Sequence, residues 1–173
     1  MTCVRTTRVL RYPWVDLFNL VLDVTSYPAF VPHCREVRLL SRQMAGRGKT
    51  VIVSRMCVGF SLFEVSYANQ TTADPNERKI CVEALDGPLR FLDAVWTFEP
   101  RDESRTQVQF LVDYEFSNPV FATVGSRVFG TMFDKIVDAF ERRAAQLFSA
   151  RNATDARQGR NWAPPGSQAI NAD

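Results

Sequence analysis

The residues best suited to covalent chemistry are adjacent in the stretch VTSYPAFVPHC, residues 24–34, which places the only histidine of the chain, His33, beside Cys34. A thiol becomes a catalytic nucleophile when an imidazole within hydrogen-bond reach takes its proton. Side chains that are neighbours on a strand point to opposite faces, and the chain has no second histidine to serve as the base. We therefore expect no catalytic residue at this pair.

The remaining reactive residue types also lack the spacing that their chemistry needs. The four cysteines, at positions 3, 34, 57 and 81, form no closely spaced pairs of the kind that hold structural zinc. No secretory leader is recognisable before them, so we expect free thiols in a reduced compartment. The turn Gly46-Arg47-Gly48 lacks the frame of a phosphate-binding loop and is typical of a hairpin. The sequence thus predicts no metal site and no cofactor.

Acidic residues are scattered, and one of them interrupts an apolar run. Asp93 lies within LRFLDAVWTF, where alternation places it on the same face as Phe91 and Val95. This position indicates an edge or a bend of a strand more than an acid or a base. A cyclase or hydrolase would need several polar groups converging in one cavity, and the sequence shows few.

The composition is that of an ordinary globular protein with a large aromatic interior. The chain has 173 residues, of which 46% are hydrophobic and 13 are phenylalanine, and its formal net charge is +2. This length allows one domain with a proper core. A net charge this small does not by itself indicate binding to nucleic acid. No apolar run reaches the ~18–20 residues that a membrane-spanning helix requires.

The hydrophobic periodicity predicts short elements first and a long meander afterwards. A strand is expected over residues 3–11, then a helix that has Pro13 at its first position and stops near Asp23. A short helical turn around residues 26–31, limited by Pro28 and Pro32, comes next. Five or six antiparallel strands with short turns follow. Their expected ranges are 34–42, 49–59, 62–72, 78–85, 89–99 and 105–116.

A long amphipathic helix is expected after the last strand. Asn118 is a plausible N-cap, Pro119 suits the first turn, and the apolar stripe continues to about Phe148. Two glycines within this helix, Gly125 and Gly130, are expected to allow close approach or local flexibility. Residues 149–173 have little apolar periodicity, so we divide the chain into a domain over residues 1–148 and a disordered tail over 149–173.

This order of elements predicts an α+β fold of the helix-grip type. A curved antiparallel sheet would wrap around the long C-terminal helix, with two short helices after the first strand. The dry face of such a sheet is larger than one helix can cover, so a cavity is expected between them. Cavities of this kind are where apolar ligands bind.

Three stretches together carry a resemblance to a known family. They are LFNLVLDVTSYPAFVPHC, ALDGPLRFLDAVWTFEP and YEFSNPVFATVGSRVFGTMFDKIVDAFERRA. The chain resembles, over about residues 3–148, the coenzyme Q-binding START-like family, which includes the bacterial ribosome-association toxin and lies beside the polyketide cyclases. The resemblance implies a helix-grip START-like fold with a hydrophobic tunnel for ubiquinone or a related polyisoprenoid lipid. It implies no catalytic residues.

The resemblance also implies which positions matter. Tyr27, Pro28, Phe30, Pro32 and Cys34 match the motif at the tunnel mouth. Positions in the central strand and at the entry of the long helix match further motifs: Gly87, Pro88, Leu92, Trp96, Phe98, Phe116, Ser117, Asn118 and Pro119. The predicted ligand-binding residues are Tyr27, Pro28, Phe30, Pro32, Leu92, Trp96, Phe98, Phe116, Phe129, Phe133 and Val137.

Two positions depart from the family pattern. His33 stands where relatives often have tryptophan, and Ala94 stands where they often have glycine. These departures predict a different mouth shape and a different strand curvature.

The function implied is a non-enzymatic chaperone that carries ubiquinone, its bound ligand, in support of respiratory electron transport or quinone biosynthesis. One five-carbon isoprene unit costs on the order of 3–4 kcal/mol to expose to water, so such a lipid needs shelter to leave a membrane. The expected partners are the lipid and, transiently, a membrane surface to which arginines of the first strand or of the tail would be attracted. The expected location is cytoplasmic and peripheral to the inner membrane in a bacterium, or the matrix side of the mitochondrial inner membrane in a eukaryote.

One alternative from another class remains open. A ribosome-association toxin of the same family would bind the large ribosomal subunit and block subunit joining, and the same motifs match it. Binding to DNA is not expected.

Overall fold

Seven strands form one antiparallel sheet in the order β1-β7-β6-β5-β4-β3-β2, in a computed structural model that describes residues 2–60 and 63–158. The side chains of residues 60, 63, 120, 121, 123–130 and 152–158 lie outside that description. The elements are β1 (Thr2–Leu10), α1 (Trp14–Leu22), the 3-10 helix η1 (Val24–Ala29), β2 (Cys34–Ala45), the short turn η2 (Gly46–Gly48), β3 (Lys49–Phe60), β4 (Phe63–Asp74), β5 (Lys79–Ala84), β6 (Leu89–Pro100), β7 (Thr106–Phe116) and α2 (Pro119–Gln158).

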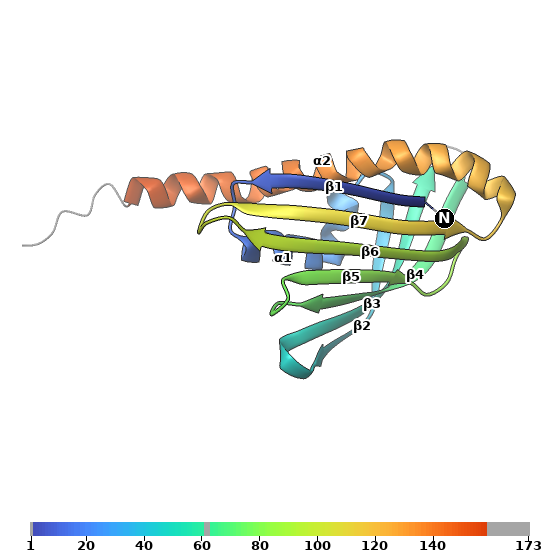
Figure 1. Ribbon diagram of the computed structural model, residues 1–173, viewed down its shortest axis with the longest axis horizontal. Helices are drawn as coiled ribbons and strands as arrows, with labels where there is room; N and C mark the ends of the chain where they lie inside the picture. Colours follow the sequence, from blue (N-terminus) through green and yellow to red (C-terminus); the bar gives the residue numbers. More distant parts are fainter. Residues whose placement is uncertain (1, 61–62, 159–173) are drawn as a thin grey trace, which may run out of the picture.

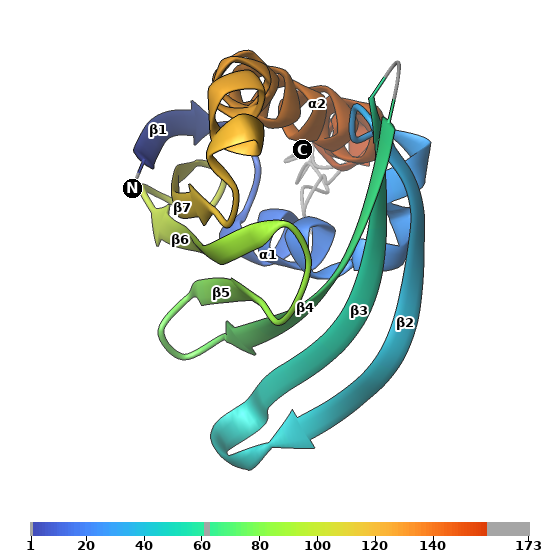
Figure 2. The same ribbon diagram turned by 90° about the vertical axis from the view of Figure 1, so that its right-hand side faces the viewer.

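The predicted α+β helix-grip architecture is confirmed. The sheet curves strongly, α1 lies within its concave side, and α2 runs lengthwise beside β1 and across the open side of the curve (Figures 1 and 2). β1 and β2 are the two edge strands, because each pairs with only one neighbour. The β2–β3 hairpin extends away from both helices (Figure 2).

Alternation along the central strands explains which face encloses the core. On β6 the buried residues are Leu92, Ala94, Trp96 and Phe98, whereas Asp93 between them is exposed. β7 alternates in the same way, with its buried side chains at every second position from Thr106 to Tyr114. This two-residue period puts one face of each strand against the helices and the other in solvent, as the sequence predicted.

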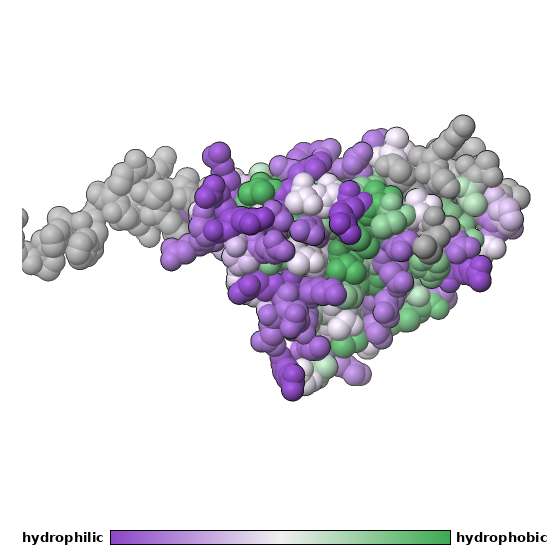
Figure 3. Space-filling view, viewed as in Figure 1, coloured by the Kyte–Doolittle hydropathy of each residue, from purple (hydrophilic) through white to green (hydrophobic). Residues whose placement is uncertain are grey.

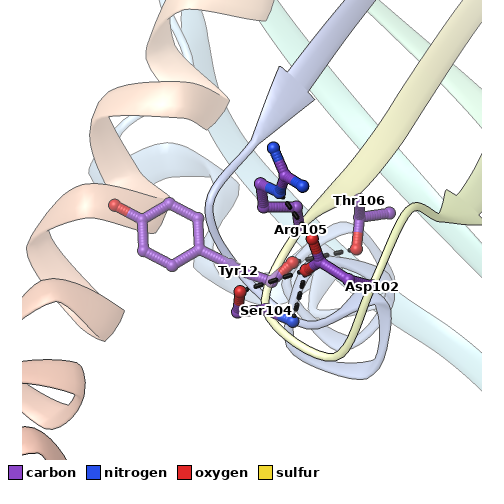
Figure 4. A network of polar contacts seen from close by, with 5 residues as sticks. All are labelled: Tyr12, Asp102, Ser104, Arg105 and Thr106. Atoms are coloured by element: carbon purple, nitrogen blue, oxygen red, sulfur yellow. Dashed lines mark hydrogen bonds and ion pairs between the residues drawn. The ribbon is translucent and has the colours of Figure 1, made fainter.

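The β6–β7 turn is tied to the segment that joins β1 to α1. The Thr106 hydroxyl donates a 2.8 Å hydrogen bond to the Tyr12 carbonyl, and the Asp102 carboxylate accepts one of 2.6 Å from Arg105 (Figure 4). The Arg105 contact, helped by the backbone N–H of Ser104, lowers the pKa of Asp102 to about 2. The Tyr12 ring points from this network toward α2 (Figure 4).

Helix α2 continues past the predicted end at Phe148, so residues 149–158, which we assigned to the tail, are helical. The continuation is anchored to the N-terminal part of the domain. Tyr12 packs on Phe148 with ring centroids 5.6 Å apart and hydrogen-bonds Ser149 at 3.1 Å, and Arg151 forms an ion pair with Asp16. The composition of residues 149–158 indicated a disordered tail because contacts with residues far away in the sequence do not show in the composition of a segment. Residues 159–173 of the predicted tail lie outside the described residues.

Candidate ligand cavity

An apolar cavity is lined by residues of β1, α1, β6, β7 and α2. Helix α1 contributes one wall because Leu17, Leu20 and Val21 recur at helical spacing and are all buried. The strands contribute the opposite wall through the inward-facing residues described above. The complete lining is Thr6, Arg8, Leu10, Leu17, Leu20, Val21, Trp96, Phe98, Val108, Phe110, Val137, Phe140 and Glu141.

The cavity is small in this conformation. Its volume is about 30 Å³, which is about the space that one or two water molecules occupy. A single isoprene unit is larger than this, so a polyisoprenoid chain enters only if part of the wall moves. The walls that could move are α1 and α2, since the strands are held by the hydrogen-bonded ladder.

Stacked aromatic rings form the floor of the cavity. Trp96 stacks on Phe110 with centroids 3.9 Å apart, and Phe110 stacks on Phe133 at 5.1 Å with an angle of 5° between the planes. Phe140 from α2 packs on Trp96 at 5.1 Å. These contacts join β6, β7 and α2, so moving α2 away would expose a continuous aromatic surface to an entering ligand.

Charged side chains occur only at the rim among the described lining residues. Arg8 and Glu141 are both exposed, and Arg8 hydrogen-bonds the Thr6 hydroxyl at 2.9 Å. Elsewhere in the described chain, no three His, Cys, Asp or Glu side chains form a group that could hold a metal ion. The described lining is therefore mainly apolar, and its two charged side chains are exposed.

The mouth motif has a structural role that the sequence did not reveal. The Tyr27 hydroxyl donates to the Val21 carbonyl at the end of α1. Its ring packs edge-on against Phe30 at 5.9 Å and against Phe140 at 5.3 Å. Burial raises the pKa of Tyr27 far above its ordinary value, so the hydroxyl stays protonated and keeps donating. Tyr27 thus connects α1, η1 and α2 behind the cavity wall.

His33 and Cys34, the pair considered for covalent chemistry, lie where η1 leads into β2. His33 has a left-handed backbone, with φ of 64°, and its Nδ1 lies 3.1 Å from the Gly59 carbonyl. Cys34 is buried, and this burial, with a smaller contribution from Cys57, raises the pKa of its thiol to about 11. A nucleophilic cysteine requires a lowered pKa. The shift at Cys34 is in the opposite direction, and the absence of a catalytic role for this pair stays a prediction.

The predicted ligand-binding residues fall into several groups. Trp96, Phe98 and Val137 line the cavity, whereas Tyr27, Phe30 and Phe133 support residues that line it. The others are not brought to it: Leu92 is buried elsewhere in the core, Phe116 packs on Tyr114, Pro32 is half-buried and Pro28 is exposed. The side chain of Phe129 is outside the described residues.

Sequence reasoning missed the contribution of α1 and β1. Leu17, Leu20 and Val21 showed the helical period, but nothing in that pattern distinguishes a core residue from one that borders a cavity. Arg8 on β1 and Glu141 on α2 lie far apart in the sequence, and both border the cavity only because the fold brings these two elements to it.

Comparison with known proteins identifies the family. The family model described as polyketide cyclase / dehydrase and lipid transport matches residues 10–141. The chain is 30% identical over 145 residues to the ribosome association toxin RatA of Escherichia coli, which covers 84% of this chain and 88% of that protein. It is 25% identical over 149 residues to the mitochondrial coenzyme Q-binding protein COQ10 of Dictyostelium discoideum, which covers 85% of this chain and 71% of that protein.

A solved structure agrees with these relationships. The solution structure of an 18 kDa protein from Caulobacter crescentus matches with a TM-score of 0.70 and 30% sequence identity, and covers 86% of this chain and 99% of that one. The residues that the family model matches include the mouth motif and the cavity-lining strands β6 and β7. The chain therefore belongs to the polyketide cyclase, dehydrase and lipid transport family, in agreement with the START-like family that its motifs indicated.

Proposed function

We propose that this protein binds ubiquinone or a related polyisoprenoid lipid between its sheet and α2 and carries it without chemical change. The observation that supports this most directly is the apolar cavity, whose described wall is aliphatic and aromatic apart from Thr6, Arg8 and Glu141. Relatives named as coenzyme Q-binding proteins match most of the chain. Binding of this kind would support respiratory electron transport or quinone biosynthesis, and it requires neither an enzymatic residue nor a cofactor.

Loading would involve a movement of α2. The cavity of about 30 Å³ is too small for an isoprene chain, and α2 contacts the sheet through ring packing of Phe133 and Phe140 rather than through a hydrogen-bonded ladder. Sliding such rings apart costs less than breaking strand pairing, because the entering lipid replaces the lost apolar contacts. The proposed site is thus formed as the ligand enters.

Lipid extraction and a matched pair of variants test the proposal. Purified protein is extracted with organic solvent and analysed by mass spectrometry, and binding of added ubiquinone is then measured. Val137→Phe adds a ring inside the cavity, and Val15→Phe adds the same ring on an exposed position of α1. We expect the first variant to lose about ten-fold or more in quinone affinity and the second to bind like the wild type.

Two outcomes would contradict the proposal. A wild-type protein that carries no isoprenoid and does not bind added quinone removes this function. Equal binding by the two folded variants would place the quinone outside the cavity. Thermal unfolding of both variants shows whether Val137→Phe has kept the fold, because overpacking a core costs about 1–3 kcal/mol.

A second candidate function is favoured by the relatives named as ribosome association toxins, which are 30% identical to this chain. On this alternative the protein would bind the large ribosomal subunit. Co-sedimentation with large ribosomal subunits at low salt distinguishes the two functions. A ribosome-binding protein should sediment with the subunits, whereas a quinone carrier should stay at the top of the gradient.

The place of action follows from the lipid. Among the described residues, no helix is both long enough and apolar enough to cross a bilayer. We propose a peripheral position at the bacterial inner membrane on the cytoplasmic side, or at the matrix side of the mitochondrial inner membrane. Cell fractionation with an antibody to the protein tests this location.

A further inference from the structure

Positive charge is concentrated in the β2–β3 hairpin. Residues 34–60 contain six basic side chains and one acidic one, Glu36, which gives a net charge of +5. The whole chain has a net charge of +2, so the residues outside the hairpin sum to 2 − 5 = −3. The basic residues are Arg35, Arg38, Arg42, Arg47, Lys49 and Arg55. The small net charge of the whole chain is therefore the sum of a strongly basic β2–β3 hairpin and a remainder with negative net charge.

Most of these charges are balanced locally, but two are not. Ion pairs join Arg35 to Glu64, Arg38 to Glu36, Lys49 to Asp74 and Arg55 to Asp86. In the described part of the chain, no ion pair joins Arg42 or Arg47 to a carboxylate, and both side chains are exposed. Arg47 belongs to η2, the turn of the hairpin, and Arg42 lies four residues before that turn on β2. The turn is at the end of the hairpin that extends away from both helices (Figure 2).

Strand β2, which forms one edge of the sheet, also exposes large apolar side chains. Leu39, Leu40 and Met44 on β2 are 45%, 50% and 73% exposed. A register shift between Leu39 and Ser41 leaves Leu40 as an extra residue opposite β3, a bulge that presents two consecutive leucines at the surface. Met44 is held in place by the Thr50 hydroxyl, which donates to its sulfur at 3.4 Å.

We propose that Leu39, Leu40, Met44, Arg42 and Arg47, here called the β2 edge surface, dock on a bilayer of anionic phospholipid. The arginines would contact phosphate groups while the leucines and the methionine enter the acyl boundary. This inference rests on the proposed function, because a carrier of a membrane lipid must reach the bilayer. The projecting end that carries this surface is mainly hydrophilic with apolar residues beside it (Figure 3).

Other occupants fit these observations less well. A nucleic-acid surface would combine arginines with exposed aromatic rings that stack on bases, whereas the large exposed apolar residues of β2 are aliphatic. An added strand would need a regular edge, but bulges at Arg35 and Leu40 interrupt β2 twice. Anionic lipid matches both the charge and the aliphatic character, and each arginine near such a surface strengthens binding about five-fold.

Vesicle co-sedimentation tests the inference directly. The probe is a quinone-free vesicle of phosphatidylcholine with phosphatidylglycerol, compared with phosphatidylcholine alone. We expect the wild type to prefer the anionic vesicles. The double variant Arg42→Gln with Arg47→Asn should bind about 25-fold more weakly, and asparagine suits position 47 because Arg47 has a φ of 64°. Leu40→Ser should weaken binding about five-fold.

Matched controls lie elsewhere on the molecule. Arg5→Gln removes an exposed arginine from β1, the opposite edge of the sheet, and so separates the β2 edge surface from the first strand, where membrane contact was expected from the sequence. Leu85→Ser removes a leucine that is 54% exposed between β5 and β6. Both should bind vesicles like the wild type. Because the vesicles contain no quinone, the result is independent of quinone binding. A protein that docks on anionic vesicles but has no affinity for quinone would refute the proposed function and still support the β2 edge surface as a membrane contact.

Three results would overturn the inference. One is a wild type that does not distinguish anionic from neutral vesicles. Another is a loss of binding in Arg5→Gln or Leu85→Ser equal to that in the β2 variants. The third is ribosomal RNA binding that requires Arg42 and Arg47 but is unchanged in Leu40→Ser, together with unchanged vesicle binding, which would assign the basic edge to RNA.

Discussion

The indole of Trp96 lies nearly flat on the ring of Phe110, with 3.9 Å between the centroids and 16° between the planes. Both rings line the cavity, so a quinone that enters must contact or displace one of them. We expect added ubiquinone to change the Trp96 fluorescence. The change should be lost in Trp96→Phe and retained in Trp14→Phe, since Trp14 is not among the lining residues. A signal that persists without Trp96 would place the ligand elsewhere.

Gly87 is expected to be intolerant of any side chain. Its φ is +109°, and a Cβ at this position would lie 2.6 Å from the Cβ of Tyr67. Gly87→Ala should therefore destabilise the fold by about 2–4 kcal/mol, from backbone strain and from the clash together. Urea denaturation measures the loss. Gly46→Ala, where an added Cβ meets nothing within 4 Å, is the control and should change stability little.

Alkaline pH should destabilise the protein through Cys34. Burial raises the pKa of its thiol from 9.0 to about 11, so between these pH values the folded chain keeps a proton that the unfolded chain has lost. The contribution of Cys34 is complete below pH 9.0 and falls as the pH rises toward 11. Tyr67, whose pKa burial raises to about 12, extends the loss to higher pH.

The variant Cys34→Ala isolates this effect. It should lower stability at neutral pH but show a flatter decline above pH 9, as measured by thermal unfolding across a pH series. The exposed Cys3 supplies the comparison, because Cys3→Ala should keep the wild-type decline. An unchanged slope in Cys34→Ala would assign the alkaline loss to other groups.

Carboxylates oppose one another across three strands on the outer face of the sheet. Glu83 is directly opposite Asp93, and Asp93 is directly opposite Asp113. One Asp113 carboxylate oxygen is also buried without a hydrogen-bond partner among the described residues. Like charges in this arrangement destabilise a sheet, so Asp93→Asn should stabilise the protein by about 0.5 kcal/mol.

A double-mutant cycle tests the cause of that gain. Asp113→Asn should add less stability in the presence of Asp93→Asn than alone, because the repulsion is already removed. Added salt should stabilise the wild type more than Asp93→Asn, since screening weakens exposed charge pairs. Strict additivity of the two substitutions would show that the carboxylates do not interact.

The fold was more predictable from the sequence than the site. Strand alternation at Leu92, Trp96 and Phe98 is a local pattern that the structure reproduces. The apolar stripe of α2 is also a local pattern, and it is reproduced by the described buried side chains from Met132 to Ala144. The predicted end of α2 at Phe148 was wrong, because the contacts that hold the continuation join residues far apart in the chain. These contacts are Ser149 with Tyr12 and Arg151 with Asp16.

For the site, the sequence predicted contact residues but not the cavity itself. Tyr27 and Phe30 were predicted to bind the ligand, and both rings pack on Phe140, which lines the cavity. Their contact with a ligand stays a prediction. Leu20 and Val21, which do border the cavity, look like any other core residues of an amphipathic helix. Periodicity gives the buried face of an element, whereas a cavity depends on how several such faces fit together.

The pairing of β1 with β7 has a consequence for how the protein is made. Thr2 is aligned with Tyr114, so the first strand has no sheet partner until most of the chain has been synthesised. Until then its neighbours in sequence, including the apolar face of α1, remain without the strands β6 and β7 that cover them. Contacts of such long sequence separation slow folding and prolong exposure to aggregation. The nascent chain should therefore depend on chaperones until β7 leaves the ribosome, and it should complete its fold only then.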